Sequence, residues 1–204
     1  MNTTRKVVVL DYGSGNLRSA ERALARVGAD VTVTPDVEVA AAARALVVPG
    51  VGAFAACMAG IRAIGADDVV RARVSAGRPV LGICVGMQVL YDAGDEHGVE
   101  TAGIGVLDGR VERLHADVLP HMGWNTVAAP ADSTLFAGVG DQRFYFVHSY
   151  AVHRTAAAAG ETVTEHGEPF VAAVEAGPVS ATQFHPEKSG DAGLQLLANW
   201  VRSL

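Results

Sequence analysis

The sequence predicts an α/β fold with a mostly parallel open sheet, flanked by helices and extended by antiparallel strands in the C-terminal half. Three observations support this prediction. Short β-branched runs alternate with helical stretches through the first half, which is typical of a parallel sheet with helices on both faces. Short strand-like segments separated by turn residues dominate the second half. The 23 glycines among 204 residues indicate many tight turns, which a simple helical bundle would not need.

The predicted elements follow in a regular order. Residues 6–10 are a β-branched run and should form the first strand. Asn16 is expected to cap the next helix and Gly28 to end it, because apolar residues recur at helical spacing between them. Further strands are expected at 30–34, 45–48 and 79–83, and a helical stretch interrupted near Gly65 should reach about residue 76. In the second half we expect strands at 110–114, 143–147, 161–166, 171–175 and 179–184, and a closing helix at 191–201.

The composition excludes several classes of protein. The length fits one domain over residues 1–204, and a hydrophobic fraction of 50% supplies a full core. A net charge of −6 gives no electrostatic reason to bind nucleic acid or a membrane surface. The longest charge-free stretch, 45–61, is broken by Pro49 and three glycines, so no membrane span is expected. The apolar run at 7–10 is too short for a signal peptide, and two cysteines without metal-ligand spacing favour a reducing, cytoplasmic location.

Cys84 lies at a predicted strand-to-helix elbow. The Gly-Ile-Cys-Val-Gly segment at 82–86 follows the strand at 79–83 and precedes a short helical pattern that runs through Tyr91. Glycines on both sides of the cysteine permit a tight turn, the arrangement of hydrolases that carry a nucleophilic serine in a Gly-x-Ser-x-Gly motif. A helix that begins after Cys84 would favour the thiolate form of its side chain. The alternative is that Cys84 is a small buried apolar residue, which is how we interpret Cys57.

A base for this thiol is available in the Gln-Phe-His-Pro-Glu-Lys segment at 183–188. In an extended chain, residues two apart point to the same side, so His185 and Glu187 can lie together. A carboxylate beside an imidazole fixes its tautomer and stabilises the imidazolium that forms when a thiol is deprotonated. A lone His-x-Glu pair is weak support, but together with the elbow it predicts Cys84, His185 and Glu187 as nucleophile, base and orienting residue.

A glycine-rich loop, Pro-Gly-Val-Gly-Ala-Phe at 49–54, follows the strand at 45–48. Its spacing superficially matches the dinucleotide-binding fingerprint, but that fingerprint belongs on the first strand and needs an acidic residue on the next one. Here the loop follows the third strand, and Asp67 and Asp68 fall in a helical stretch. We therefore expect an oxyanion loop, whose glycines leave backbone N–H groups free to face a developing negative charge beside Cys84.

Together these motifs resemble those of the class I (triad) glutamine amidotransferases, which release ammonia from glutamine for a synthase. The resemblance rests on Gly-Ile-Cys-Val-Gly-Met-Gln at 82–88 and Phe-His-Pro-Glu-Lys-Ser at 184–189. Four further segments, at 11–19, 49–54, 121–125 and 145–150, narrow it to the glutaminase subunits of imidazole glycerol phosphate synthase. The resemblance extends from about residue 7 to about residue 200.

This resemblance implies a mechanism. The Cys84 thiolate attacks the side-chain amide of L-glutamine, His185 protonates the departing ammonia, and water then releases glutamate from a thioester on Cys84. The oxyanion is expected to be held by backbone N–H groups of Val85 and of the loop at Val51 and Gly52. Glu96 would face the substrate α-ammonium, and the alternative for it is a solvated loop charge. Residues of the matching motifs that should bind glutamine are Gly52, Gln88, Glu96, His148, Ser149 and Tyr150.

The resemblance also implies a partner. This is a (β/α)8-barrel cyclase subunit, which uses the ammonia to convert the ribonucleotide PRFAR into imidazole glycerol phosphate and AICAR in histidine biosynthesis. We expect a heterodimer with an internal ammonia path and an interface at Asn16, Met122, Trp124 and Lys188, although Lys188 is alternatively a solvated lysine. In this family, glutaminase activity is weak until the partner and its substrate bind, and a peptide of the 51–52 loop is implicated as the switch.

Three alternatives remain open. The chain can serve a different synthase, such as the anthranilate, aminodeoxychorismate or pyridoxal phosphate systems, although the segments at 121–125 and 145–150 argue against that. It can be a noncatalytic module with the same fold, although every catalytic position holds a competent residue. It can also be a thiol hydrolase with another substrate. No cofactor is expected, and no metal either, because none of the seven histidines has the spacing of a zinc protease motif.

Overall fold

A computed structural model describes residues 5–153 and 160–204 of the chain. Its centre is a seven-stranded sheet with the spatial order β11 (Gly160–His166), β12 (Glu168–Ala176), β13 (Val179–Thr182), β4 (Val80–Cys84), β3 (Ala45–Gly50), β1 (Lys6–Leu10) and β2 (Asp30–Thr34). The strands from β13 to β2 are all parallel, whereas β12 and β11 extend the sheet as antiparallel strands. The predicted fold class is therefore confirmed.

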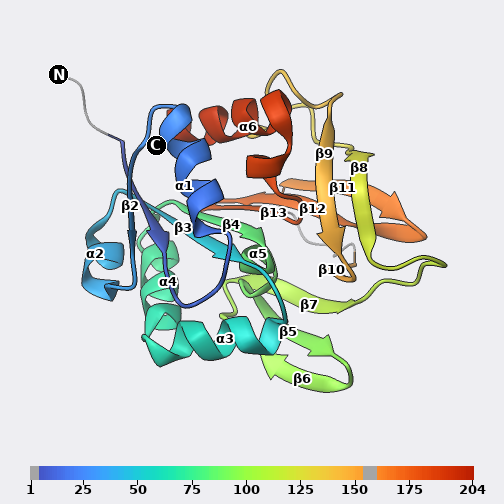
Figure 1. Cartoon of the computed structure of the whole chain (residues 1–204), viewed down its shortest axis with the longest axis horizontal. Helices are drawn as coiled ribbons and strands as arrows, with labels where there is room; N and C mark the ends of the chain where they lie inside the picture. Colours follow the sequence, from blue (N-terminus) through green and yellow to red (C-terminus); the bar gives the residue numbers. More distant parts are fainter. Residues whose placement is uncertain (1–4, 154–159) are drawn as a thin grey trace.

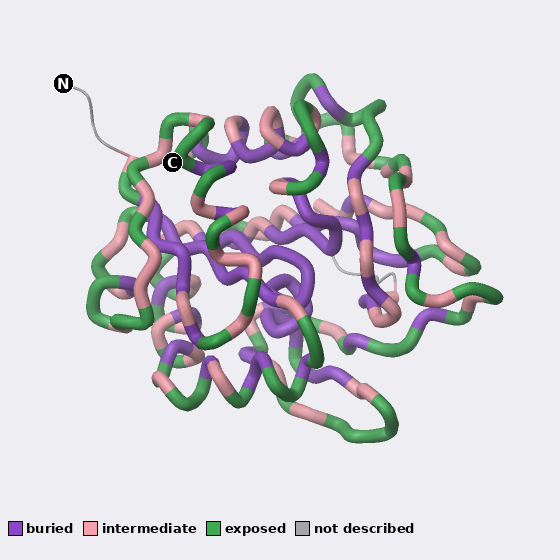
Figure 2. Tube along the Cα trace, viewed as in Figure 1, coloured by how far each residue is buried: buried purple, intermediate pink, exposed green. Residues whose placement is uncertain are grey.

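Helices cover both faces of this sheet (Figure 1). The first helix, α1 (Leu17–Arg26), packs beside the last, α6 (Gly190–Ser203), on one face. The other face carries α2 (Val37–Ala42), α3 (Phe54–Ala63) and α4 (Ala66–Ser75). All residues of β3 and β4 are buried between these layers, as the purple central trace in Figure 2 shows. Such strands consist of apolar and small residues because both of their faces are covered.

The second half of the chain differs from the prediction of a single extended sheet. A four-stranded sheet has the order β10 (Tyr150–Val152), β7 (Leu107–Arg113), β5 (Tyr91–Glu96) and β6 (Val99–Ala102). A separate pair is formed by β8 (His121–Thr126) and β9 (Arg143–His148). The predicted strands at 110–114 and 143–147 exist with shifted bounds, but they belong to these smaller sheets. The strands β5, β6, β8 and β10 and the short helix α2 are absent from the sequence prediction.

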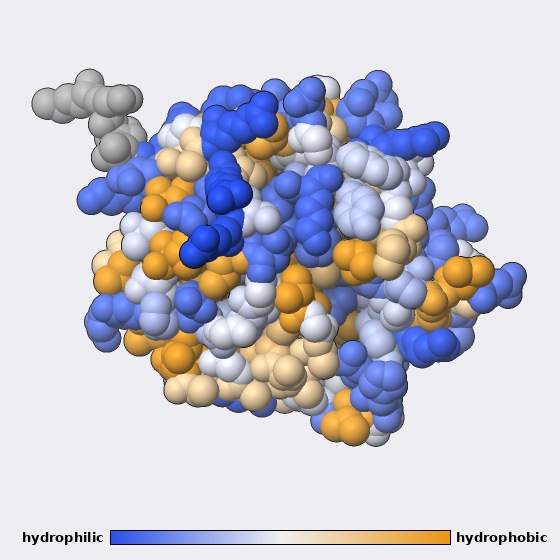
Figure 3. All heavy atoms as spheres, in the orientation of Figure 1, coloured by the Kyte–Doolittle hydropathy of each residue, from blue (hydrophilic) through white to orange (hydrophobic). Residues whose placement is uncertain are grey.

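An aromatic cluster joins the β8–β9 pair to the main sheet. Phe144 and Phe184 stack with 4.4 Å between their ring centroids, and Phe146 packs edge-on against Phe184. Trp200 on α6 is 2% exposed and belongs to the core. On the face drawn in Figure 3, apolar side chains are interspersed with polar ones. No helix within the described ranges is long and apolar enough to cross a membrane.

Candidate active site

Cys84 lies where β4 ends and the one-turn helix α5 (Val85–Gln88) begins. Its backbone adopts φ 56° and ψ −116°, a conformation that L-residues rarely adopt and that typically costs about 1–3 kcal/mol. A Cβ on Gly86 would approach the Val48 carbonyl oxygen to 1.8 Å, and one on Gly82 would approach the Gly86 oxygen to 2.7 Å. Both glycines are thus required, as the elbow interpretation expects. The helix is shorter than predicted, because Tyr91 already begins β5.

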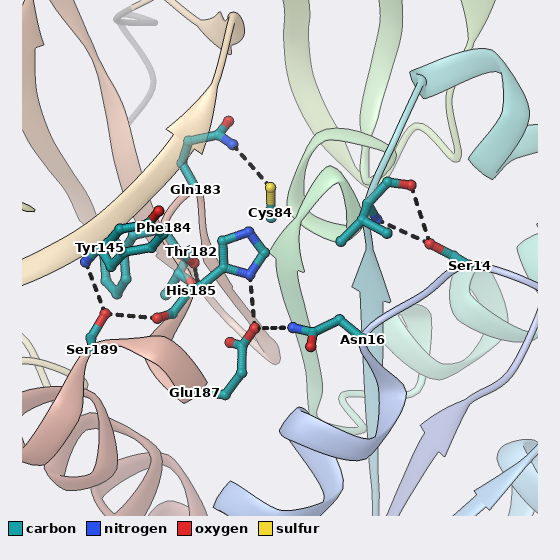
Figure 4. A network of polar contacts seen from close by, with 11 residues as sticks. Ser14, Asn16, Cys84, Tyr145, Thr182, Gln183, Phe184, His185, Glu187 and Ser189 are labelled. Atoms are coloured by element: carbon teal, nitrogen blue, oxygen red, sulfur yellow. Dashed lines mark hydrogen bonds and ion pairs between the residues drawn. The ribbon is translucent and has the colours of Figure 1, made fainter. Parts of the chain in front are cut away.

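His185 and Glu187 lie side by side just after β13, where Pro186–Lys188 form a 3₁₀ turn. The Nδ1–H of His185 donates to Glu187 Oε1 at 2.8 Å, and both side chains are at most 2% exposed. Asn16 Nδ2 donates to the same carboxylate oxygen at 2.5 Å (Figure 4). The other oxygen, Oε2, is buried without a hydrogen-bond partner among the described residues. The carboxylate is therefore oriented by His185 on one side and Asn16 on the other.

The backbone of His185 is fixed by the neighbouring strand β9. Its N–H donates to the Tyr145 carbonyl at 3.0 Å. The Ser189 hydroxyl donates to the His185 carbonyl at 2.7 Å and accepts from the Tyr145 N–H at 2.9 Å (Figure 4). These bonds fix the His185 backbone relative to β9, and the bond to Glu187 then orients its imidazole.

The charge on His185 reflects its two partners. Burial by itself lowers the pKa of His185, but its hydrogen bonds and charge interactions with the Cys84 sulfur and the Glu187 carboxylate outweigh burial and raise the pKa to about 9. At neutral pH the imidazole is therefore protonated next to the cysteine sulfur. A protonated imidazole beside a thiol favours the nucleophilic thiolate and holds a proton ready for a leaving group.

The glycine-rich loop that we predict to form the oxyanion hole follows β3, and one of its N–H groups is already bonded. The Val51 N–H donates to Ser14 Oγ at 3.0 Å, and the Val51 carbonyl accepts from Ser14 Oγ at 3.3 Å and from Cys57 Sγ at 3.4 Å. Cys57 is buried, as expected, yet its thiol is engaged in this hydrogen bond rather than only packed. Gly52 has φ +90°, the left-handed region that favours glycine. In this conformation the Val51 N–H faces Ser14, so it is not free to meet a ligand.

A cavity of about 650 Å³ opens beside Cys84. Of the residues predicted for catalysis, the oxyanion hole, substrate binding or the interface, those that line it are Val51, Gly52, Cys84, Val85, Gln88, Glu96, His148, Ser149, Tyr150, His185 and Lys188. Glu187 lies behind His185, outside the cavity wall. Sequence reasoning missed Arg113 at the end of β7, a cation that shares the cavity wall with Lys188. No motif contains Arg113, so only its position in the fold indicates it.

Two of the cavity residues have well-defined partners. The Gln88 amide nitrogen donates to the Tyr150 carbonyl and to Gln183 Oε1, both at 2.9 Å. Both amide hydrogens are thereby used, which leaves Gln88 Oε1 as an acceptor. Glu96 Oε2 accepts the Phe54 N–H at 2.7 Å, at the first residue of α3. The side chain of Glu96 is therefore fixed at the N-terminus of α3. This contact argues against the alternative that Glu96 is a solvated loop charge.

The other predicted interface residues lie apart from the cavity. Met122 and Trp124 on β8 are 62% and 53% exposed. Asn16 is the N-cap residue of α1, as predicted, but its backbone lies in the left-handed region with φ 70° and its side chain makes no capping hydrogen bond. The physical reason is competition, because its amide donates to Glu187 instead. The role of these three residues in an interface stays a prediction.

One group of metal-ligand side chains occurs in the part of the chain that the structure describes. Donor atoms of His115, His153 and Glu168 lie within 4.8 Å of one another. The Glu168 carboxylate already accepts from the His115 N–H at 2.6 Å and pairs with the Nδ1 atoms of His115 and His153 at 3.0 and 3.4 Å. These contacts account for the cluster as polar contacts to one carboxylate, and a cation would have to displace them.

Comparison with known proteins places this site in a family. The model of the family "Glutamine amidotransferase class-I" matches residues 8–204. The chain is 64% identical to imidazole glycerol phosphate synthase subunit HisH of Nocardia farcinica, over 99% of this chain and 100% of that one. It is 61% identical to the HisH subunit of Streptomyces coelicolor, over 98% of this chain and 94% of that one. It is 60% identical to the HisH subunit of Mycobacterium tuberculosis, over 99% of this chain and 100% of that one.

Solved structures agree on the fold. A crystal structure of a glutamine amidotransferase has a TM-score of 0.77 at 24% identity, covering 97% of this chain and 99% of its own. A glutamine amidotransferase of Thermotoga maritima has a TM-score of 0.66 at 15% identity, covering 99% and 83%. The chain belongs to the class-I glutamine amidotransferase family. Within that family it groups with the HisH subunits of imidazole glycerol phosphate synthase.

Proposed function

We propose that this chain hydrolyses L-glutamine to glutamate and ammonia at Cys84, His185 and Glu187, and delivers the ammonia to a barrel cyclase subunit for histidine biosynthesis. The observation that carries the proposal is the arrangement of three groups at one cavity. Cys84 lies at a glycine-bounded elbow, His185 is bonded to a buried Glu187, and a cavity of about 650 Å³ opens on the sulfur. Family membership supplies the reaction class, and this geometry supports the role of each residue.

The reaction proceeds in two halves. His185 already holds a proton at neutral pH, so the Cys84 thiolate forms a bond to the side-chain carbonyl carbon of glutamine, whose oxygen becomes an oxyanion. The oxyanion collapses, the carbon–nitrogen bond breaks, and the nitrogen takes the proton from His185 to leave as ammonia. Water then adds to the thioester as His185 accepts its proton, and the carbon–sulfur bond breaks to release glutamate and restore the thiolate beside protonated His185. Glu187 stays ionised and orients the imidazole throughout.

Binding uses the rest of the cavity wall. Gly52, Ser149 and Tyr150 contribute backbone, while Gln88 Oε1 accepts a hydrogen bond from an N–H donor of the ligand. Glu96 faces the α-ammonium group, and the cations Arg113 and Lys188 on the same wall suit the α-carboxylate. His148, which also lines the cavity, supports this wall through its bond to the Tyr150 carbonyl at 2.9 Å.

The oxyanion hole is assembled from Val85 and the loop of Val51 and Gly52. Because the Val51 N–H is bonded to Ser14, the chain alone has an incomplete hole and low activity. Removing one oxyanion donor typically costs roughly 10²–10³ in turnover, so release of this N–H is a sufficient switch. The proposal therefore includes activation by the partner through this peptide.

The partner follows from the relatives, which are named as subunits of imidazole glycerol phosphate synthase. The cyclase takes up ammonia to convert PRFAR into imidazole glycerol phosphate and AICAR, within a cytoplasmic heterodimer. The interface includes Asn16, Met122, Trp124 and Lys188, of which Met122 and Trp124 expose large apolar side chains that a partner would cover. One domain over residues 1–204 carries the glutaminase activity.

The test is glutamate release from glutamine by the purified chain, alone and with the barrel cyclase and PRFAR. We expect strong stimulation by the cyclase, and loss of all activity in Cys84→Ala. Equal activity with and without the cyclase would leave the triad assignment standing but would reject the assignment to imidazole glycerol phosphate synthase. The chain would then serve a different synthase. Full activity of Cys84→Ala would reject the triad itself.

A further inference from the structure

A continuous line of hydrogen bonds runs from β8 to the cavity wall. Asn125 Nδ2 lies 3.3 Å from His121 Nε2, His121 Nδ1 lies 3.0 Å from His148 Nε2, and His148 Nδ1 lies 2.9 Å from the Tyr150 carbonyl. That carbonyl also accepts from the Gln88 amide at 2.9 Å. We call these groups, from Asn125 to Gln88, the polar line. The catalytic steps proposed above do not use His121 or Asn125.

The chemistry of the two ends determines every proton along the polar line. A carbonyl oxygen only accepts, so His148 must carry its proton on Nδ1 and offer Nε2 as an acceptor. His121 must then donate from Nδ1, which leaves its own Nε2 as an acceptor. The Asn125 amide nitrogen can supply that last donor, because it also donates to the Glu165 carbonyl at 3.0 Å and so must be the nitrogen end. Both imidazoles are neutral and each is held in its Nδ1–H tautomer.

The surroundings of His121 enforce this arrangement. Its ring is 6% exposed and stacks between Phe146 and His166, with centroid distances of 4.8 and 4.3 Å. Burial, followed by the nearby charge of His166, lowers the pKa of His121 to about 4. Burial likewise lowers the pKa of His148 to about 3. The charged form of either ring would place two donors against each other, which agrees with these low values.

From this geometry we infer that His121 is a positioning residue for the glutamine site, acting through His148 on the Tyr150 carbonyl. The inference rests on the proposed function and extends it to a residue outside the cavity. Gln88 can turn its Oε1 toward a ligand only while its nitrogen has the Tyr150 carbonyl and Gln183 Oε1 as acceptors. The Gln183 nitrogen in turn lies 3.8 Å from Cys84 Sγ. The position of one carbonyl therefore affects both the ligand contact and the surroundings of the sulfur.

Without the His121 donor, the polar line no longer fixes the tautomer of His148. His148 would be free to move its proton to Nε2, which would leave the Tyr150 carbonyl opposite an unprotonated Nδ1. Two acceptors facing each other repel, so the Tyr150 backbone and the Gln88 amide would lose their shared orientation. Loss of one good hydrogen bond at a binding wall corresponds to roughly a tenfold change. Ligand binding should suffer more than the chemical step, because the polar line supports the wall and not the triad.

The experiment compares three variants of the full chain, assayed with the cyclase and PRFAR. His121→Phe keeps a flat ring for stacking but removes the donor, and His121→Asn places an amide nitrogen where Nδ1 was. His166→Phe is the matched control, because it keeps the stack and lies outside the polar line. We expect His121→Phe to lower kcat/KM for glutamine about tenfold, mainly through KM, with His121→Asn recovering most of the loss and His166→Phe unchanged.

A spectroscopic measurement tests the proton positions independently of activity. Long-range ¹H–¹⁵N correlation on histidine-labelled chain should show Nδ1–H tautomers at His121 and His148, and His121→Phe should shift His148 toward Nε2–H. An Nε2–H tautomer of His148 in the unmodified chain would overturn the inference, as would a folded His121→Phe variant with unchanged KM. Absence of glutamine turnover by the unmodified chain would instead reject the proposed function, and the role of His121 with it.

Discussion

Ser14→Ala should raise the glutaminase activity of the chain in the absence of its partner. The Ser14 hydroxyl accepts the Val51 N–H at 3.0 Å and donates to the Val51 carbonyl at 3.3 Å, so the substitution removes two hydrogen bonds from the backbone of Val51, one on each of its two flanking peptides. Each is worth about 1 kcal/mol in net terms. Together they favour the bonded backbone conformation by about 2 kcal/mol, which corresponds to roughly a 30-fold change in population. The Cys57 thiol still bonds the carbonyl at 3.4 Å and restrains the peptide in part.

The expected result is therefore a rise of about 10- to 30-fold in basal glutamate release at saturating glutamine, with a smaller stimulation by the cyclase and PRFAR. The assay is glutamate release from glutamine, measured with and without the cyclase and PRFAR as above, and thermal unfolding is recorded to confirm that the variant is folded. Ser14→Thr keeps the hydroxyl and should retain the low basal rate. Basal activity that is unchanged or lower in a folded Ser14→Ala protein would refute the idea that this hydrogen bond withholds the oxyanion donor.

Three further predictions follow from the site. Glu187→Gln removes a charge that helps raise the pKa of His185, so turnover should fall about 10²- to 10⁴-fold. A raised pKa of His185 stabilises the fold below about pH 6.5, and this contribution is lost as the pH rises through about 9. The melting temperature of Glu187→Gln should therefore depend less on pH between these values than that of the unmodified chain. Asn16→Ala should lower kcat several-fold with little change in KM, since it removes a donor from the Glu187 carboxylate, and an unchanged kcat would show that Asn16 does not orient the triad. Gly86→Ala should not yield a folded enzyme, because its Cβ would meet a carbonyl oxygen at 1.8 Å, whereas the exposed control Gly140→Ala should fold and turn over normally.

Three strands of the parallel half could be predicted because they contain continuous apolar runs. Residues 7–10, 45–48 and 80–83 are buried, so their composition alone indicates strands without a two-residue alternation. The arrangement of the proposed triad was also predictable, since Cys84 lies within a compact glycine motif and His185 and Glu187 are only two residues apart. Motifs of this kind keep their chemistry and their local geometry in the same few residues.

The second half was harder to predict because pairing partners, not local patterns, decide its architecture. β8 is His-Met-Gly-Trp-Asn-Thr, which has weak strand propensity but gains stability by pairing with β9 in full register. The strand at 110–114 has no feature that distinguishes the main sheet from a separate one. Side-chain contacts across long separations were equally hidden, as with Asn16 and Glu187, which are 171 positions apart. Local propensity therefore indicated the cap position of Asn16 correctly, but it could not show that the Asn16 side chain makes a tertiary contact instead of a capping hydrogen bond.

One short loop connects the two halves of the catalytic machinery. Ser14 bonds the Val51 peptide and Asn16, two residues later, bonds the Glu187 carboxylate, so the loop between β1 and α1 contacts both the oxyanion loop and the triad. The left-handed backbone of Asn16, with φ 70°, turns its amide toward Glu187 while α1 begins at the next residue. A contact that displaces this loop must alter both bonds together. Because Asn16 is also an expected interface residue, partner binding at this point would release the Val51 N–H and adjust the His185 orienting group in a single movement.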